Sequence, residues 1–122
     1  MATINLDIDN FGSVINDNDI VIVDFWAEWC GPCRLFAPTF EASSNKHEDI
    51  VFGKVDTEAQ QALAANFQIM SIPTLMVFRE NILLFNQPGA LPADALEDII
   101  DQVKALDMDE IRKEIESGTP SE

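Results

Sequence analysis

The apolar residues of this chain fall into runs that predict an α/β fold. Nearly continuous apolar and β-branched runs occupy Ile20–Trp26, Ile50–Val55 and Thr74–Phe78. Runs of this kind are typical of strands that are buried on both faces of a sheet. We therefore expect these three segments to form the centre of a sheet.

A fourth apolar run, Ile82–Phe85, follows the short polar link Arg79-Glu80-Asn81. A short polar link between two strand-like runs predicts an antiparallel hairpin, and Asn81 tolerates the positive φ that such a turn needs. Thr74–Phe78 and Ile82–Phe85 are therefore expected to pair.

Helical patterns separate the predicted strands. They cover Pro32 to about Asn45, Thr57–Asn66 and Pro92–Leu106. In the last of these, apolar residues recur at the spacing of one helical face. Strands that alternate with helices predict a layered α/β domain.

The final segment has a different pattern. Asp107 can cap a helix, with Glu110 three residues later as in a capping box. Apolar residues then recur at helical spacing, at Met108, Ile111 and Ile115. We expect a second short helix there, followed by disorder over Ser117–Glu122.

Composition narrows the possible functions. The 122 residues suit one domain, and 22 acidic against 7 basic residues give a net charge of −15. Such a charge argues against nucleic acid or an anionic membrane as a partner, because phosphate contacts need clustered Lys and Arg. The chain has no apolar run long enough to span a membrane and no signal-peptide pattern at its start, so we expect a cytoplasmic location.

Both cysteines lie in one octet, Trp26-Ala27-Glu28-Trp29-Cys30-Gly31-Pro32-Cys33. Gly31 and Pro32 favour a tight turn that brings the two sulfurs within disulfide distance. If the turn leads into a helix, the unpaired N–H groups of the helix start favour a thiolate at the first cysteine. Two closely spaced cysteines in such a chain are typical of redox or metal sites.

The chain resembles the thioredoxin family. The resemblance is carried by Val23-Asp24-Phe25-Trp26-Ala27-Glu28-Trp29-Cys30-Gly31-Pro32-Cys33, Ala37-Pro38, Lys54-Val55-Asp56, Ile72-Pro73-Thr74 and Gly89-Ala90-Leu91. It covers about residues 3–106 and leaves the last 16 residues, 107–122, outside. It implies a three-layer α/β/α thioredoxin fold, with a central mixed sheet flanked by helices on both faces.

The resemblance also implies an activity. A thioredoxin reduces protein disulfides by thiol–disulfide exchange through a mixed disulfide, and so takes part in electron transfer and cell redox homeostasis. It binds no cofactor, and a separate thioredoxin reductase restores it with electrons from NADPH. Its partners are therefore disulfide-containing client proteins and that reductase.

The positions of the two cysteines suggest their roles. Cys30 comes first, at the exposed edge of the predicted helix, and is the expected nucleophile. Cys33, one turn further in, is the expected resolving thiol. The alternative is half of a zinc site, but four ligands are needed and His47 is the only histidine, so only dimerisation or carboxylates could complete it.

Asp24 lies in the middle of an apolar strand, where an ionised carboxylate is costly to bury. We expect it to be buried with a raised pKa, the alternative being a solvated strand edge. The resemblance implies that Asp24 takes the proton from Cys33 and that Lys54 lies near it. A surface lysine is the alternative for Lys54.

Other residues are expected to bind the client or tune the site. Trp29 adjoins Cys30 and is expected to form an exposed apolar rim. The resemblance implies that Ile72 offers its backbone to an extended client. It also implies that Pro73 is cis, against the base rate for X–Pro bonds, and tunes the site with Gly31 and Pro32. Gly89 and Ala90 then complete the groove, although a simple turn before a helix is equally compatible with them.

Further residues are expected to lie outside the chemistry. Trp26 packs beneath the cysteine turn and needs a partner for its indole N–H, Thr74 serves packing only, and His47 is a solvated helix-end residue. Met70 and Ser71 differ from many relatives, which carry a basic or polar residue followed by glycine, and make this face more apolar.

The organisation expected from the sequence is a monomer with a thioredoxin domain at 1–106 and an acidic extension at 107–122 that rests on it. Two rival functions remain at this point. One is an oxidant or isomerase of the same fold, and the other is a binding module that holds partners through Trp29, Met70 and Ile72.

Overall fold

A mixed sheet forms the centre of the computed structural model, which describes residues 2–118. Its five strands within those residues are β1 (Thr3–Asn5), β2 (Ile20–Trp26), β3 (Val51–Asp56), β4 (Thr74–Arg79) and β5 (Ile82–Pro88). Their order is β1-β3-β2-β4-β5, with β1, β3 and β2 parallel and β4 antiparallel to both neighbours. The predicted hairpin is confirmed, and Glu80 and Asn81 both have positive φ in its turn.

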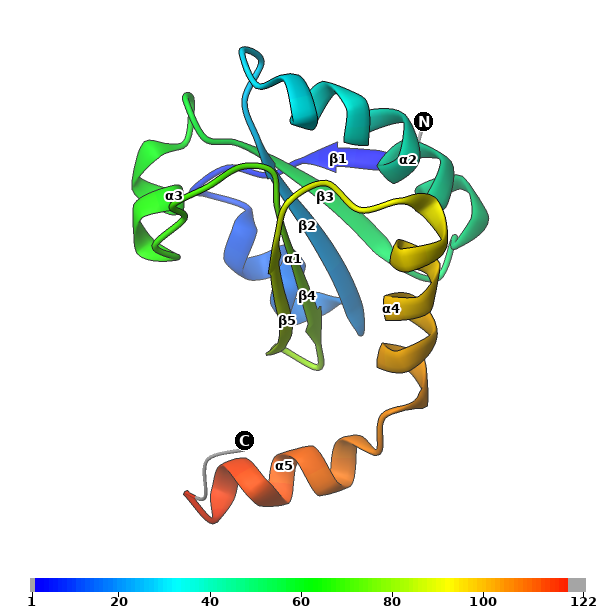
Figure 1. Cartoon of the computed structure of the whole chain (residues 1–122). Helices are drawn as coiled ribbons and strands as arrows, with labels where there is room; N and C mark the ends of the chain where they lie inside the picture. The colour runs from blue at the N-terminus through cyan, green and yellow to red at the C-terminus, as the bar shows by residue number, and fades with distance from the viewer. Residues whose placement is uncertain (1, 119–122) are drawn as a thin grey trace.

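Helices cover both faces of the sheet (Figure 1). They are α1 (Phe11–Asp17), α2 (Gly31–Lys46), α3 (Gln61–Asn66), α4 (Ala93–Ala105) and α5 (Met108–Glu116). One core cluster joins α2 and α4 to the sheet, and a second joins α1 and α3 to its other face. The expected three-layer α/β/α architecture is confirmed.

The alternation of side chains along β2 divides these two clusters. Ile20 and Ile22 belong to the α2 and α4 cluster, whereas Val21 and Val23 belong to the α1 and α3 cluster. By the same alternation Asp24 projects on the α2 side of the sheet. The position of the acid in an apolar strand therefore places it under the helix that begins at the cysteines.

The sequence pattern gave no prediction for β1 and α1. β1 has three residues and pairs only with β3, so it has no apolar periodicity of its own. α1 has seven residues, of which Phe11 and Ile15 are buried. Just before this helix, the carboxylate of Asp7 accepts hydrogen bonds from the backbone N–H groups of Asp9 and Asn10. Both elements are too short for a periodic signal.

Helix α3 begins at Gln61 rather than at the predicted Thr57. The Asp56 carboxylate accepts hydrogen bonds from the backbone N–H groups of Glu58 and Ala59, at 2.9 and 3.3 Å. These bonds hold the first residues of the predicted helix in a turn. Smaller differences are a one-residue displacement of β3 and the extension of β5 to Pro88.

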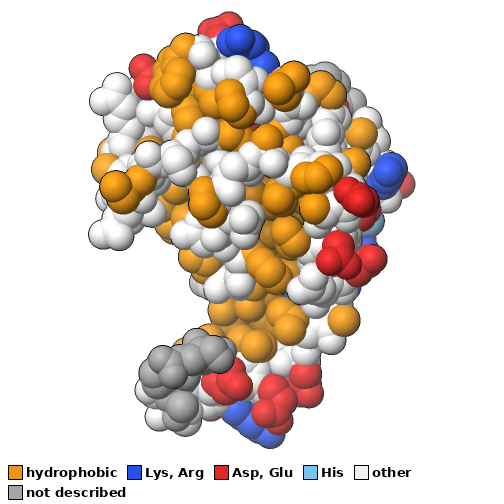
Figure 2. Space-filling view, viewed as in Figure 1, with side chains coloured by type: hydrophobic (Ala, Val, Ile, Leu, Met, Phe, Trp, Pro, Cys, Tyr) orange, Lys and Arg blue, Asp and Glu red, His pale blue; other side chains and the backbone are white. Residues whose placement is uncertain are grey.

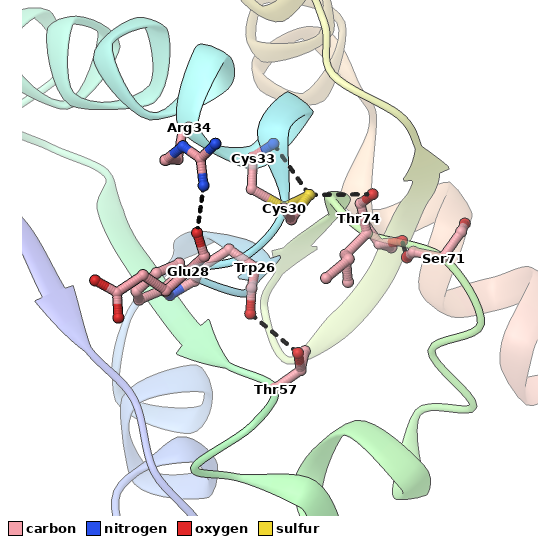
Figure 3. Close-up of a disulfide and its surroundings, with 9 residues drawn as sticks. Trp26, Glu28, Cys30, Cys33, Arg34, Thr57, Ser71 and Thr74 are labelled. Carbon is pink, nitrogen blue, oxygen red and sulfur yellow. Dashed lines mark hydrogen bonds between the residues drawn. A yellow bond between two sulfur atoms is a disulfide. The ribbon is translucent and has the colours of Figure 1, made fainter.

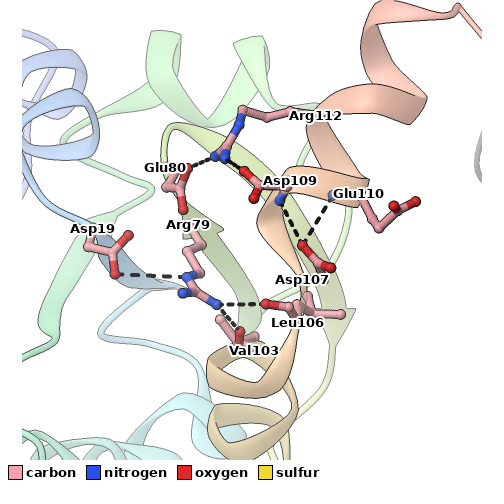
Figure 4. A network of polar contacts seen from close by, with 9 residues as sticks. All are labelled: Asp19, Arg79, Glu80, Val103, Leu106, Asp107, Asp109, Glu110 and Arg112. Carbon is pink, nitrogen blue, oxygen red and sulfur yellow. Dashed lines mark hydrogen bonds and ion pairs between the residues drawn. The ribbon is translucent and has the colours of Figure 1, made fainter.

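Arg79 connects the end of β4 to the end of α4 (Figure 4). Its Nη1 donates hydrogen bonds to the carbonyl oxygens of Val103 and Leu106, at 2.8 and 3.3 Å, and its Nε lies 3.8 Å from the Asp19 carboxylate. The guanidinium thereby satisfies carbonyl groups that the last turn of a helix leaves unpaired.

The predicted helix after Asp107 is present as α5. The Asp107 carboxylate caps it by accepting hydrogen bonds from the backbone N–H groups of Asp109 and Glu110, at 3.0 and 3.3 Å. Met108 is buried, and Arg112 forms ion pairs with Glu80 and Asp109 (Figure 4). One side of α5 therefore rests on the domain, at the end opposite the cysteine turn (Figure 1).

The disorder predicted over 117–122 is not found at its first two residues. Ser117 and Gly118 continue from α5 as a turn, with backbone hydrogen bonds to the carbonyl oxygens of Lys113 and Ile115, at 3.0 and 3.1 Å. The rest of that prediction, at 119–122, lies outside the described residues.

Hydrophobic side chains also reach the surface. Figure 2 shows them gathered in a band that runs down the molecule toward α5. Several of the half-buried ones pack against the α2 and α4 core, namely Leu84, Phe85, Leu91 and Ile99. Among residues 2–118, no helix has the length and apolar character that crossing a membrane requires.

Candidate active site

A disulfide joins Cys30 and Cys33 at the start of α2, with their Cα atoms 5.2 Å apart (Figure 3). Cys30 is the N-cap residue, and Gly31 and Pro32 are the first residues of the helix. Pro is favoured there because it lacks the N–H that the first turn would leave unpaired. The Cys33 N–H points at Cys30 Sγ, with the nitrogen 3.2 Å from the sulfur. The helix start therefore directs a backbone donor at the first sulfur.

The two sulfur-bearing residues are less exposed than the sequence suggested. Cys30 is 4% exposed and Cys33 is 2% exposed. Trp26 and Ile72 pack against the small buried cluster that holds both cysteines. The expectation that Cys30 lies at an exposed edge is therefore wrong, because Trp26, four residues before it, and Ile72, from the loop before β4, both pack against the disulfide cluster.

The loop before β4 lies against the disulfide. The Ile72–Pro73 peptide bond is cis, as the resemblance implied. The Ile72 carbonyl oxygen is 3.7 Å from Cys30 Sγ. Gly89 donates its N–H to the Pro73 carbonyl oxygen at 2.8 Å and adopts φ of 98°, a conformation that favours glycine. Segments 72–73 and 89 are thus brought together at the site, as expected for a groove.

Thr74 has a role that the sequence interpretation missed. Its hydroxyl donates a 2.6 Å hydrogen bond to the Ser71 carbonyl oxygen across the cis-proline loop (Figure 3). Thr74 is itself buried. It therefore fixes the loop that faces the disulfide and does more than fill space. A hydroxyl residue directly after a proline was the available signal for such a turn bond.

Asp24 is buried as predicted, with 1% of its surface exposed. Neither carboxylate oxygen has a hydrogen-bond partner among the described residues. Burial raises the pKa of Asp24 from its ordinary 3.8 to about 7, and the charge of Lys54 opposes that rise. A carboxyl group with this pKa can both hold and release a proton near neutral pH.

Lys54 lies opposite Asp24 on the neighbouring parallel strand. Its Nζ is 4.8 Å from the centre of the Trp26 ring, within the distance of a cation–π contact. The Trp26 Nε1 is buried and has no partner among residues 2–118, so the expected indole hydrogen bond is not found there. Two neighbouring strands therefore bring a carboxyl group, an ammonium group and an indole together, and the indole side chain packs against the disulfide cluster.

The rim of the site is largely exposed. Trp29 is 67% exposed, so the expectation of an exposed apolar side chain beside Cys30 is confirmed, and Ala90 is also exposed. Arg34 donates from Nη1 to the Glu28 carbonyl oxygen at 2.7 Å, which ties α2 to the loop before the disulfide (Figure 3). The Trp26 carbonyl oxygen accepts the Thr57 N–H at 2.9 Å, which fixes the other side of this loop.

His47 was expected to be a solvated helix-end residue; it does lie at the end of α2, as the residue that caps it, but the expectation that it is solvated is wrong. Its side chain is 17% exposed, and Nε2 lies 2.6 Å from Glu97 Oε1 of α4. Ser43 donates a 2.7 Å hydrogen bond to the other oxygen of the same carboxylate. Burial alone would raise the pKa of Glu97, but the bonds from His47 and Ser43 and nearby positive charge hold it below its ordinary value. His47 thus bridges two helices away from the disulfide.

The alternative of a zinc site requires further ligands close to the two cysteines. Within residues 2–118, His, Cys, Asp and Glu form no group of three or more that could hold a metal ion. Cys30 and Cys33 are bonded to each other.

Comparisons with known proteins agree with the site. Residues 2–102 match the family model described as "Thioredoxin". The chain is 54% identical over 114 residues to a protein described as "Putative thioredoxin 2" of Streptomyces coelicolor, covering 93% of this chain and 85% of that one. It is 40% identical over 103 residues to "Thioredoxin C-3" of Corynebacterium nephridii, covering 84% of this chain and 71% of that one.

The fold has close counterparts among solved structures. A mutant thioredoxin from Halobacterium salinarum superimposes with a TM-score of 0.80 at 31% identity, covering 86% of this chain and 93% of that one. A Plasmodium falciparum thioredoxin gives a TM-score of 0.76 at 36% identity, covering 82% of this chain and 97% of that one.

A helix-capping disulfide beside a cis-proline loop, with a buried carboxyl group in the strand that leads to it, defines a site for thiol–disulfide exchange. With the family match over residues 2–102, the chain belongs to the thioredoxin family. It is accordingly a protein-disulfide oxidoreductase of the reductase type, a class that requires no bound cofactor.

Proposed function

We propose that Cys30 is the nucleophile that reduces client disulfides. The observation that carries this proposal is the Cys33 N–H, directed at Cys30 Sγ from 3.2 Å at the start of α2. After reduction, the same N–H and the positive end of the helix stabilise a thiolate on Cys30. Cys33 has no equivalent position at the helix start.

The exchange then proceeds in two balanced steps. The Cys30 thiolate attacks one client sulfur, the client S–S bond breaks, and the second client sulfur leaves as a thiolate that takes a proton from water. A mixed disulfide now joins Cys30 to the client. The Cys33 thiolate attacks Cys30 Sγ, which forms the Cys30–Cys33 bond and releases the first client sulfur. The client gains two electrons and this protein loses them.

Asp24 is the proposed acceptor of the Cys33 proton. Burial raises its pKa to about 7, so its ionised form is present at neutral pH and still has affinity for a proton. Lys54 is the proposed tuning residue, because its charge opposes that rise. Without Lys54, the pKa of Asp24 would be higher and less of the base would be available.

The residues around the disulfide form the proposed client groove. Ile72 offers its backbone to an extended client segment, in the manner of strand addition. Pro73 and Gly89 hold this loop through their 2.8 Å hydrogen bond. Trp29 and Ala90 line the two sides, and Gly31 and Pro32 set the turn of the disulfide.

We also propose how the protein is reduced again, where it acts and how the chain is organised. A separate thioredoxin reductase reduces the Cys30–Cys33 disulfide back to the dithiol with electrons from NADPH, in the cytoplasm, and the chain acts as a monomer. Residues 1–106 form the catalytic domain, and 107–122 form an extension that α5 anchors through Met108.

Trapping the mixed disulfide tests these roles. Reduced Cys33→Ser is mixed with a disulfide-containing protein such as insulin, and the products are separated without reductant and weighed by mass spectrometry. We expect a Cys30-linked adduct with Cys33→Ser and none with Cys30→Ser. An adduct through Cys33 in the Cys30→Ser variant, at a comparable rate, would show that the roles are reversed.

A further inference from the structure

Met70 places an oxidisable thioether at the surface of the protein, in the loop that precedes β4. Its side chain belongs to a residue that is 96% exposed, whereas Met76 is 1% exposed and Met108 is 5% exposed. Peroxides convert methionine to methionine sulfoxide, and this reaction requires that the oxidant reach the sulfur. Dissolved oxidants therefore reach the sulfur of Met70 freely, while the other two sulfurs are enclosed in the fold.

The segment that carries Met70 forms a ridge between two hollows. Residues 69–71 line both of them. One hollow, of about 190 Å³, is also lined by Trp29 and Ile72, and the other, of about 270 Å³, is also lined by Asn86. Met70 is thus the exposed side chain on a ridge that borders the disulfide site on one side and the end of β5 on the other.

The ridge is held close to the reactive sulfur. The Thr74 hydroxyl donates a 2.6 Å hydrogen bond to the Ser71 carbonyl oxygen, which fixes the loop directly after Met70. The Ile72 carbonyl oxygen lies 3.7 Å from Cys30 Sγ. Two residues of chain span at most about 7 Å, so the backbone of Met70 lies within that distance of the backbone at Ile72. A client that reaches Cys30 therefore comes close to the ridge.

We propose that Met70 is a site of reversible oxidation, at which a peroxide converts the thioether to the sulfoxide and thereby slows the reduction of client disulfides. The inference rests on the proposed function and adds to it a means of regulation. With hydrogen peroxide, one oxygen atom is transferred to the Met70 sulfur, the O–O bond breaks, an S=O bond forms and water is released. The sulfur loses two electrons and the peroxide gains them.

The reverse step requires a methionine sulfoxide reductase and a dithiol. The sulfoxide oxygen leaves as water, the dithiol becomes a disulfide, and the Met70 sulfur regains two electrons. The modification is therefore reversible without any change in the peptide chain.

The chemical change at Met70 affects clients and leaves the fold intact. A sulfoxide is strongly polar and accepts hydrogen bonds from water, whereas a thioether is a weak acceptor. A client that covers the ridge displaces this water, which costs free energy unless the client supplies a donor. In the free protein the sulfoxide stays solvated, because Met70 is almost fully exposed. Oxidation should therefore lower the rate of client reduction and leave the free energy of unfolding unchanged.

The site of oxidation can be mapped in the disulfide form, in which Cys30 and Cys33 are bonded to each other and present no thiol to the peroxide. The protein is treated with hydrogen peroxide for increasing times, the peroxide is removed with catalase, and proteolytic peptides are weighed. We expect the Met70 peptide to gain one oxygen atom while Met76 and Met108 remain unmodified. Oxidation of Met76 or Met108 at the same rate as Met70 would overturn the proposal.

The effect on the reaction is measured after this treatment. Treated and untreated proteins are reduced with dithiothreitol, which is then removed, and their reduction of insulin is followed under single-turnover conditions. We expect the treated wild type to be about threefold slower than the untreated one, and a methionine sulfoxide reductase to restore the rate. Denaturant unfolding of the two samples should give the same midpoint.

Two variants of Met70 provide matched controls. Met70→Leu is apolar and lacks the sulfur, so its treated and untreated samples should react at the same rate. Met70→Gln has a polar side chain that peroxide does not oxidise, and it should be about threefold slower than Met70→Leu without any treatment.

The outcomes separate this inference from the proposed function. If Met70 is fully oxidised and insulin is still reduced at the untreated rate, this inference alone fails. An equal loss of rate in treated Met70→Leu would assign the effect to another residue and overturn it as well. If the untreated wild type does not reduce insulin, the proposed function fails with it.

Discussion

Replacing Asp24 with asparagine should stabilise the oxidised protein in a pH-dependent way. Asp24 is 1% exposed, and burial raises its pKa from 3.8 to about 7 in the folded state. Between these two values, the folded state keeps a proton that the unfolded state releases. The free energy of unfolding of the wild type therefore falls as the pH rises from about 4 to about 7. Above about pH 7, Asp24 is ionised in both states and causes no further change.

The magnitude follows from the same two values. The pKa rises by about three units, and each unit corresponds to about 1.36 kcal/mol, so ionised Asp24 costs the folded state about 4 kcal/mol above pH 7. Asparagine has nearly the same shape and cannot ionise. Asp24→Asn should therefore gain about 4 kcal/mol over wild type between pH 4 and pH 8.

Chemical denaturation measures this difference directly. Both proteins are unfolded in guanidinium chloride at several pH values from about 4 to about 8.5, with the disulfide intact, and the fluorescence of the two tryptophans is followed. Any packing difference caused by the amide is the same at every pH and cancels from the trend. A stability difference that does not grow with pH would refute the raised pKa and the proposed proton transfer from Cys33.

The remaining predictions concern neighbouring contacts. Lys54→Met should raise the pKa of Asp24 further, because the opposing positive charge is lost. An NMR titration of the Asp24 carboxyl group measures this pKa, and an unchanged or lower value would contradict the tuning role of Lys54. Arg79→Met should lower the free energy of unfolding by about 1.5–3 kcal/mol, since it strips charged donors from the end of α4, and equal stability in denaturant would count against this. Deleting 107–122 should cost about 1–3 kcal/mol through the lost burial of Met108, with an unchanged rate of disulfide reduction; a lost activity would place the extension in the site.

The fold could be predicted where the apolar pattern was long and regular. The central strands and the hairpin were recognised because β2 and β4 are buried along most of their length. β1 and α1 escaped because three- and seven-residue elements carry no periodicity. The start of α3 was misplaced because the Asp56 side chain competes for the backbone donors that a helix would use.

The site could be predicted where the type and position of a single residue indicate its chemistry. Cys30, Cys33 and the buried Asp24 were identified from spacing and from an acid in an apolar run. The Thr74 bond across its loop was missed, although a hydroxyl residue directly after a proline is a signal for such a bond. The burial of both sulfurs could not be inferred, because it depends on Ile72, 42 residues after Cys30, packing against the disulfide cluster. The His47–Glu97 pair was missed for the same reason, since 50 residues separate its members.

The reduction potential of the Cys30–Cys33 pair tests the central claim most directly. The protein is equilibrated in graded dithiothreitol or glutathione buffers, and the dithiol fraction is determined by thiol alkylation and mass spectrometry. A client-reducing protein of this family should give a value near about −270 mV, which is characteristic of thioredoxins. A value between about −120 and −180 mV would mark an oxidant or isomerase and contradict the proposed direction, and the absence of a two-electron transition would contradict the redox function itself.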